Sequence, residues 1–269
     1  MAALYDKRSN DRGVSESIGF LLIFTIVIAG IGLVTLYGYP MLLQQQVSAD
    51  EKIMEKNMIV LQNDFKSLAY KTVPYKETSL KIGGGSLTVH NLSDSPSSLT
   101  ISDPSNNYIT NFQPGELRYE SVSAQTDISL QNGAVVLRPR INQGSTNGSV
   151  MLADPRWFYD APTQTMVINL INITRPSLMA KEGIGTVRMN LGNTTYTSRP
   201  ISPGNTNAVS VVYTPDPSND YSVAWDNYFM KIPGMGRSGS PGIGQPITYT
   251  LPPISTLVIK TYEVHIEAI

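Results

Sequence analysis

The sequence predicts an α+β protein: a long N-terminal membrane-spanning helix with an amphipathic extension, followed by an antiparallel β-sandwich-like domain. Three observations carry this prediction. A run of 22 uncharged residues lies near the N-terminus, from Ile18 to Tyr39. Residues 41–73 contain neither Gly nor Pro, which favours a continued helix. After Ser86, short alternating segments are separated by turn-rich clusters of Gly, Pro, Asn and Ser, which is typical of strands.

The composition narrows the chemistry that the chain can carry. Hydrophobic residues make up 41%, charged residues 15%, and the formal net charge is -1. A chain without a basic stripe does not favour electrostatic capture of nucleic acid. The sequence contains no cysteine, which excludes disulfides, thiolate catalysis and Cys-based zinc sites. We therefore expect no nucleic-acid partner and a fold that rests on packing and hydrogen bonds.

The run from Ile18 to Tyr39 is the strongest signal in the chain. At ~1.5 Å per residue it spans roughly the 30 Å hydrocarbon thickness of a bilayer. Core helices of soluble proteins are rarely apolar on every side over such a length. The basic residues before the run are Lys7, Arg8 and Arg12, and the first charge after it is Asp50. Because Lys and Arg concentrate on the cytoplasmic side, we expect the N-terminus inside the cell and the chain after the run outside.

A short charged segment precedes the run and reads Asp11-Arg12-Gly13-Val14-Ser15-Glu16-Ser17. A basic residue, a glycine, a polar stretch with Ser and Glu and then a long apolar helix occur in the order seen in archaeal type IV pilins and archaellins. Residues 6–40 resemble that family's class III signal peptide. The resemblance implies that a prepilin-type peptidase cuts between Gly13 and Val14 and leaves the helix attached. Residues 1–13 are then a cleavable leader, residues 14–73 the transmembrane helix and stalk, and residues 74–269 the extracellular domain.

The resemblance also implies roles for single residues. Arg12 and Gly13 would be recognition residues for the peptidase, and Val14 would be the mature N-terminus. Glu16 would be the acidic residue that pairs with a neighbouring subunit during assembly. Bacterial-type pilins carry this glutamate at the fifth mature position, whereas Glu16 would be third. Alternatively, Glu16 is a first-turn acid favoured by the helix dipole, with Ser15 as N-cap.

A conventional secretory signal is a second interpretation of the same segment. Val47-Ser48-Ala49 offers small residues of the kind cut by signal peptidase. The apolar run is longer than the ~7–15 residues usual in a signal-peptide core, and the possible cleavage point lies ten residues beyond Tyr39. This interpretation therefore fits less well than the pilin-like leader.

The helix is predicted to continue to Val73, where Pro74 ends it. Apolar residues recur in this extension at steps of three and four, which places them on one face. The main members of this stripe are Met54, Met58, Leu61, Phe65 and Leu68. Two interpretations stay open. The stripe packs against the protein's own β domain, or it packs between subunits, in which case these five residues serve assembly.

Residues 74–269 are predicted to form an antiparallel sandwich or two smaller sheets without a helix. We expect Gly83–Gly85 to act as a hinge before the first strand. Asn132-Gly133 between two alternating segments is the clearest hairpin signal. Further strands are expected at residues 117–122, 166–173, 186–191, 209–214, 247–251 and 256–266. A weak boundary near residues 143–148 would divide the domain in two.

Familiar catalytic and metal-binding patterns are absent from the sequence. His90 and His265 each stand alone in a strand-like segment. Asp216, Asn219 and Asp220 crowd together without the spacing of a calcium loop, so a surface turn is expected. Aromatic residues at 157–159 and 225–229 could bind a sugar ring, but buried packing is the favoured use. We expect no enzymatic activity, no cofactor and no metal.

Four N-x-S/T sequons occur, at Asn91, Asn147, Asn172 and Asn193. Chance predicts roughly three in a chain of this composition, so their number carries no weight. A location outside the cell would permit glycosylation at these positions.

These features predict a pilin-like cell-surface structural protein, anchored in the cell membrane by one helix with an extracellular outer domain. It would either be assembled into a filament or remain a membrane-anchored component of one, and its large outer domain suits a minor subunit of a pilus. Expected partners are membrane lipid, a prepilin-type peptidase, and further copies or other pilin-like subunits. The alternative is a monomeric membrane-anchored surface or adhesion protein that does not assemble.

Overall fold

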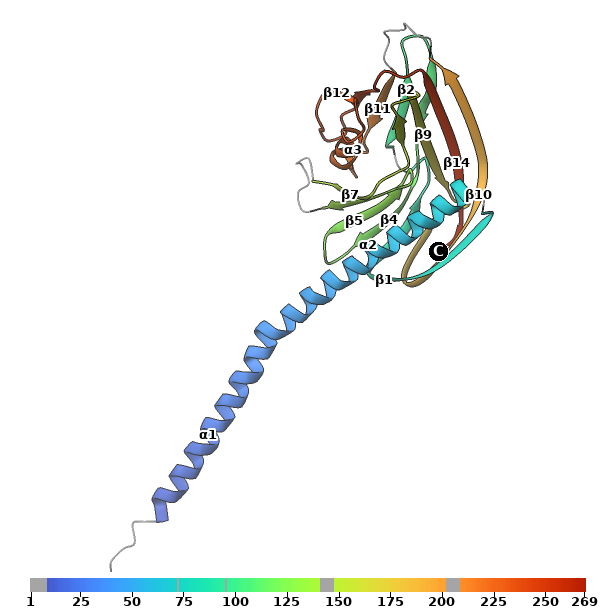
Figure 1. Ribbon diagram of the computed structural model, residues 1–269. Helices are drawn as coiled ribbons and strands as arrows, with labels where there is room; N and C mark the ends of the chain where they lie inside the picture. The colour runs from blue at the N-terminus through green and yellow to red at the C-terminus, as the bar shows by residue number, and fades with distance from the viewer. Residues whose placement is uncertain (1–8, 72, 95, 141–147, 202–208) are drawn as a thin grey trace, which may run out of the picture. The chain divides into compact units, whose positions relative to one another are not determined.

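The computed structural model describes residues 9–71, 73–94, 96–140, 148–201 and 209–269. The chain forms two compact units, residues 1–49 and 50–269. Helical backbone begins with α1 (Ser9–Leu33), passes through the π-helical turn η1 (Val34–Gly38) and continues as α2 (Tyr39–Lys71) (Figure 1). The first unit therefore contains α1, η1 and the start of α2, and the second contains the rest of α2 and the strands.

The second unit is mostly β structure, as expected, and its described residues form two sheets. The larger sheet has nine strands in the order β7-β6-β5-β4-β1-β10-β14-β9-β8. They are β1 (Tyr75–His90), β4 (Glu116–Ser121), β5 (Thr126–Gln131), β6 (Ala134–Pro139), β7 (Val150–Ala153), β8 (Phe158–Asp160), β9 (Thr165–Thr174), β10 (Met179–Pro200) and β14 (Thr256–Ala268). The smaller sheet has the order β12-β13-β11-β2-β3. Its strands are β2 (Ser98–Ser102), β3 (Asn107–Phe112), β11 (Ser210–Thr214), β12 (Gly236–Ser238) and β13 (Ile247–Thr250).

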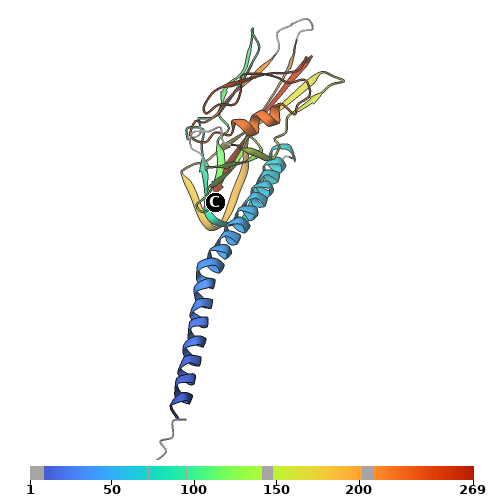
Figure 2. The same cartoon turned by 90° about the vertical axis from the view of Figure 1, so that its left-hand side faces the viewer.

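The larger sheet is covered on both faces, as the alternation of buried side chains along β9 shows. On β9, Met166, Ile168 and Leu170 belong to a cluster shared with the smaller sheet and helix α3 (Ser222–Phe229). The odd-numbered Ile171 and Ile173 belong instead to a cluster shared with α2. Since successive side chains point to opposite faces of a strand, α2 and the smaller sheet cover opposite faces of the larger sheet. Both views show the part of α2 from Asp50 onward running along the strands (Figures 1 and 2).

The expectation of a wholly antiparallel sheet is wrong at one pair. β9 and β14 are parallel, with Met166 opposite Leu257 and Ile173 opposite Val264. Apolar alternation fixes which face of a strand is buried but carries no information on the direction of its neighbour. The other strand pairs in the described ranges are antiparallel.

The glycines Gly83–Gly85 are not a hinge before the first strand, because β1 begins at Tyr75 and runs through them. They form an irregularity at which the register with β10 shifts. From Gly85 onward β1 also pairs with β4. A Cβ atom on Gly85 would lie 2.2 Å from the carbonyl oxygen of Glu120, so no other residue fits at this close approach of two strands.

The predicted hairpin is confirmed. β5 and β6 pair with Gln131 opposite Ala134, and Asn132 and Gly133 form the two-residue turn. Their φ angles are 47° and 71°, the positive values that a type I′ turn requires. The strands expected at 117–122, 166–173, 209–214, 247–251 and 256–266 correspond to β4, β9, β11, β13 and β14. Residues 186–191 are the middle of the much longer β10.

The structure also contains a helix that the sequence analysis did not expect. α3 is only eight residues long and buries most of its side chains, including Trp225, Tyr228 and Phe229. These three residues stand at positions i, i+3 and i+4, the spacing of one helical face. Their rings pack on one another and on Tyr249 of β13. The favoured interpretation of this aromatic group as buried packing therefore holds.

Candidate functional site

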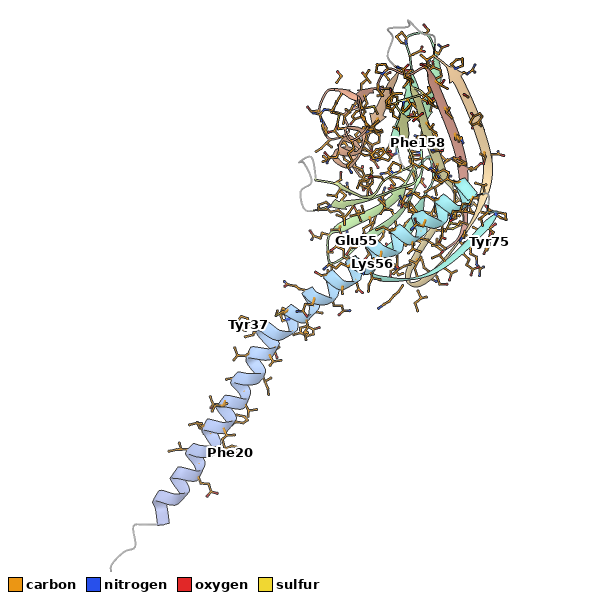
Figure 3. The ribbon with its side chains drawn as sticks, viewed as in Figure 1. Phe20, Tyr37, Glu55, Lys56, Tyr75 and Phe158 are labelled. Atoms are coloured by element: carbon orange, nitrogen blue, oxygen red, sulfur yellow. The ribbon has the colours of Figure 1, made fainter. Side chains whose placement is uncertain are left out.

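The first candidate site is the apolar surface of α1, η1 and the start of α2. Its large side chains are exposed, and those of Phe20 and Tyr37, labelled in Figure 3, are each 72% exposed. None of the residues in the most apolar stretch of this helix is buried. By length and composition the helix could cross a membrane, a property that it shares with secretory signals near an N-terminus.

Both threonine hydroxyls of this segment are bonded inside the helix. Thr25 donates its hydroxyl to the carbonyl oxygen of Leu21 at 2.7 Å, and Thr35 donates to the carbonyl of Ile31 at 2.9 Å. A hydroxyl bonded to its own helix exposes less polarity, which is the state that a lipid environment requires.

The π-helical turn η1 lies directly before Pro40. The backbone N–H of Tyr39 donates to the carbonyl of Val34, five residues earlier. Proline has no N–H to donate, and in an α-helix its ring clashes with the carbonyl four residues before it. The wider turn accommodates this residue, so the helix passes through Pro40.

The predicted processing residues lie inside helical backbone, because α1 begins at Ser9, ahead of Arg12, Gly13 and Val14. Their side chains are outside the described part of the chain. The alternative with Ser15 as N-cap is wrong for the unprocessed chain, since Ser15 is an interior residue of α1. Glu16 is exposed.

Three glycines of the apolar helix are not required by the chain's own packing. A Cβ atom added at Gly19, Gly30 or Gly32 meets nothing within 4 Å. Each glycine inside a helix costs about 0.8–1.0 kcal/mol relative to alanine. Small residues in membrane helices allow another helix to approach closely, which is one physical reason for glycine at such positions.

The second candidate was the stripe on α2, and the structure favours the first of its two interpretations. All five residues of the stripe have no exposed surface and pack in one cluster with strands of the larger sheet. They are Met54, Met58, Leu61, Phe65 and Leu68. While the domain is folded, these side chains offer no surface to a neighbouring subunit.

Gln62 lies among the buried residues of α2 and was not recognised from the sequence. Its side-chain nitrogen donates to the carbonyl of Gly133 at 2.7 Å and to the carbonyl of Asp154 at 3.0 Å. Only 1% of its surface is exposed. The helix is therefore bonded to the turn of the β5–β6 hairpin as well as packed against the sheet.

The sequons differ in their surroundings. Asn193 is exposed at the irregularity between Leu191 and Thr194 of β10, and Asn91 lies at the start of a turn, where its side chain accepts from the N–H of Leu92. Asn172 is half-buried on β9, and its side-chain oxygen is buried without a hydrogen-bond partner. Asn147 and most of the suggested 143–148 boundary lie outside the described residues. Among the three described sequons, Asn193 thus has the most accessible side chain.

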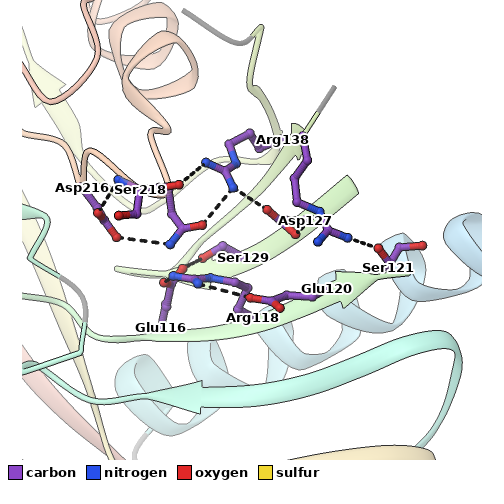
Figure 4. A network of polar contacts seen from close by, with 11 residues as sticks. Glu116, Arg118, Glu120, Ser121, Asp127, Ser129, Arg138, Asp216 and Ser218 are labelled. Carbon is purple, nitrogen blue, oxygen red and sulfur yellow. Dashed lines mark hydrogen bonds and ion pairs between the residues drawn. The ribbon is translucent and has the colours of Figure 1, made fainter. Parts of the chain in front are cut away.

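In the turn at residues 216–220, Pro217 and Ser218 are exposed, but the carboxylates of Asp216 and Asp220 are buried, and Asp216 belongs to a polar network (Figure 4). Asp216 accepts from the backbone N–H of Ser218 at 2.8 Å and from the side chain of Asn219 at 3.3 Å. Arg138 of β6 donates to the carbonyl of Ser218 and to the side-chain oxygen of Asn219, both at 2.9 Å. Among the described residues no group of three or more possible metal ligands occurs.

The same network continues across β4, β5 and β6. Arg138 donates to the carboxylate of Asp127 at 2.6 Å. On the neighbouring strand, Arg118 contacts Glu116, which also accepts from the hydroxyl of Ser129 at 2.6 Å. Removal of one member of such buried charge pairs is strongly destabilising. Because its charges are paired within the protein, the network joins the larger sheet to the segment before α3 and is not left open to a ligand.

The two histidines do not come together. His265 contacts the hydroxyl of Thr174. For His90, burial and the nearby Arg118 charge lower the pKa below its usual 6.5. The Nε2 atom of His90 is buried without a partner. This ring is consequently favoured in its neutral form.

A groove on the larger sheet is the site that the sequence analysis missed. Its volume is about 540 Å³, within the usual range for small-molecule sites. It is lined by Ala69, Tyr70, Arg156, Phe158, Val167, Asn169, Leu191, Thr194, Tyr196, Val258, Lys260 and Tyr262. These residues come from five separate parts of the chain. No local motif identifies them, although Phe158 belongs to the aromatic segment at residues 157–159.

The groove is rich in aromatic and cationic groups. The guanidinium of Arg156 lies 4.8 Å from the ring centre of Tyr70, and the ammonium of Lys260 lies 5.4 Å from that of Tyr196. Burial, with Tyr262 beside it, raises the pKa of Tyr70 well above its usual range. Tyr70 therefore presents a neutral hydroxyl at ordinary pH.

Comparison with families of known sequences identifies one match. The model of DUF7289, described as a family of unknown function, matches residues 12–267. The chain belongs to this family. The matched region of this DUF7289 protein includes both the apolar helix and almost all of the β domain, so the two occur together in the family model. Comparison with curated proteins and with solved structures gave no match.

Proposed function

We propose that this DUF7289 protein is a membrane-anchored cell-surface protein of the archaeal type IV pilin kind. The observation that carries the proposal is the exposed apolar segment of the helix, which is separated by four residues from the Arg12-Gly13 pair and leads into a β-rich domain. A helix of this length and composition suits a bilayer, and the basic residues before it favour a cytoplasmic N-terminus. The domain then faces outward.

Assembly into a filament is the second part of the proposal. The stripe on α2 is occupied by the protein's own domain, so contacts between subunits would come from the apolar helix. Gly19, Gly30 and Gly32 leave open space at their positions, which supports close packing of neighbouring helices. Glu16 is exposed and free to pair with the amine of Val14 on a neighbour after processing.

The alternative is a solitary surface or adhesion protein with the same anchor. The burial of the α2 stripe favours it, because a helix that already packs on its own domain needs no partner there. The two functions differ in whether the apolar helices contact one another in the membrane, and they share the prediction of a single anchor and an outer domain.

Processing of the leader is tested by the intact mass of the protein purified from its own cells. We expect a mature chain that starts at Val14, and we expect Gly13→Leu to retain residues 1–13. Gly148→Leu is the control, since an added side chain there has open space and should leave processing unchanged. A start near Asp50 would support the secretory signal, and an unprocessed wild-type chain would show a plain anchor.

Topology is tested in the Gly13→Leu variant, which should retain residues 1–13, with epitopes fused before Arg12 and after Ile269. Protease added to intact cells should remove the second epitope and spare the first, because the charge bias orients the helix. The reverse pattern would contradict the orientation proposed here.

Assembly is tested by cross-linking in membranes. We expect oligomers of the wild-type protein, and fewer of them after Gly30→Leu, because a larger side chain keeps neighbouring helices apart. Val60→Leu, on the exposed part of α2, is the matched control and should cross-link like wild type. A wild-type protein that cross-links only as a monomer would replace the filament subunit with the solitary surface protein.

A further inference from the structure

The groove exists because α2 is shorter than the sheet that it covers. α2 ends at Lys71, and Ala69 and Tyr70 of its last turn form one wall of the groove. Beyond them the same face of the sheet continues without a helix over it. Its floor consists of residues that are direct neighbours across strands, with Tyr196 opposite Lys260 on one side and Asn169 opposite Lys260 on the other.

The opposite wall is held in position by buried hydrogen bonds. The side chain of Asn169, 4% exposed, donates to the backbone carbonyl of Arg156 at 2.5 Å. The ring nitrogen of Trp157 donates to the backbone carbonyl of Asn169 at 2.8 Å. These contacts fix the backbone from Arg156 to Phe158 at the edge of the groove, and this fixed backbone positions the guanidinium of Arg156 and the ring of Phe158.

The charge of the groove has one sign. Two of its twelve lining residues are cationic and none is acidic. Within the described ranges neither Arg156 nor Lys260 forms an ion pair with a carboxylate. The nearby Asp154 instead pairs with Lys231. Two cations without a counter-charge favour an anionic ligand.

The aromatic groups specify the rest of that ligand. Tyr196 is 63% exposed and Phe158 is 47% exposed, so both rings are accessible to a ligand in the groove. Exposed rings of this kind present flat faces to the apolar C–H face of a sugar ring. Thr194 adds a hydroxyl at the floor, suited to a sugar hydroxyl.

From this combination we infer that the groove binds an acidic carbohydrate, in which a sugar ring packs on Tyr196 and Phe158 and its carboxylate contacts Arg156 and Lys260. A simple anion would use only the cations, and a neutral sugar would use only the rings. The inference concerns the β domain alone and does not depend on the proposed anchor or on filament assembly.

The experiment measures binding of trigalacturonate to the full chain in detergent micelles by isothermal titration calorimetry. We expect a dissociation constant below about 1 mM, and at least about tenfold weaker binding of the neutral galactose trimer and of acetate. Lys260→Gln should weaken trigalacturonate binding about tenfold, equivalent to about 1.4 kcal/mol. Tyr196→Ala should weaken it about fivefold, and its exposed position leaves folding unaffected.

The matched control is Lys181→Gln, which removes the same charge from an exposed position of β10 outside the groove. It should bind trigalacturonate as the wild type does. Equal binding of the acidic and neutral trimers would overturn the role of the cations, and equal binding of acetate would overturn the role of the rings. No binding of trigalacturonate at 10 mM, tested at about ten times the expected dissociation constant, would overturn the inference as a whole.

Discussion

Gln62 provides the sharpest test of how α2 is joined to the β domain. The substitution Gln62→Leu keeps a side chain of similar size and removes both donors to the carbonyls of Gly133 and Asp154. Each lost hydrogen bond costs about 0.5–1.5 kcal/mol, and a buried carbonyl left unpaired costs about 1–3 kcal/mol. The added apolar surface of leucine offsets part of this. We expect the free energy of unfolding to fall by about 2–4 kcal/mol.

The assay is urea-induced unfolding of the full chain in micelles. Trp157 and Trp225, the two tryptophans of the chain, are both buried in the domain and report its unfolding by fluorescence. Asn63→Leu is the control: it changes an exposed amide on the next position of α2 and should alter stability by less than about 0.5 kcal/mol. If Gln62→Leu unfolds within the same margin as this control, the hydrogen bonds to the hairpin are not contributing.

Three further predictions concern the domain. Because the pKa of His90 is lowered in the folded state, its contribution to stability is complete above pH 6.5 and declines as the pH falls through the window below 6.5. His90→Gln should flatten the pH dependence of the urea-unfolding free energy there, and an unchanged slope would contradict this role of His90. Phe65→Ala should lower the free energy of unfolding by about 3–5 kcal/mol. Val60→Ala, at an exposed site of the same helix, should lower it by less than about 1 kcal/mol. Equal losses in the two variants would contradict the burial of the α2 stripe. Gly133→Ala should cost about 1–2 kcal/mol because of its positive φ, and an unchanged denaturation midpoint would argue against the type I′ turn.

The sequence predicted the features that depend on local pattern. The apolar run needs only its length and lack of charge, and the hairpin at Asn132-Gly133 needs only two residues that tolerate positive φ. The stripe on α2 was found from its spacing, but spacing cannot say what covers it. That required knowing that Leu61 and Phe65 face the protein's own sheet.

The features that the sequence did not predict depend on distant parts of the chain. The parallel pairing of β9 with β14 joins strands about ninety residues apart, and apolar alternation has no direction. The groove combines Tyr70 and Arg156 with residues of β10 and β14, so no spacing in the sequence identifies it. α3 left a detectable signal in the spacing of its three aromatic residues, outweighed by the turn-rich segments around it.

The sheet order has a consequence for the way in which the domain is made. β14 is formed from residues 256–268, yet it lies inside the larger sheet between β10 and β9. Until β14 pairs with them, β10 and β9 each present one unpaired edge, and unpaired edges promote aggregation. Pairing across such long sequence separations is also slow. If the domain is exported in the order of its sequence, it can close only after residue 268 has left the cell, and the incomplete sheet must be protected from aggregation until then.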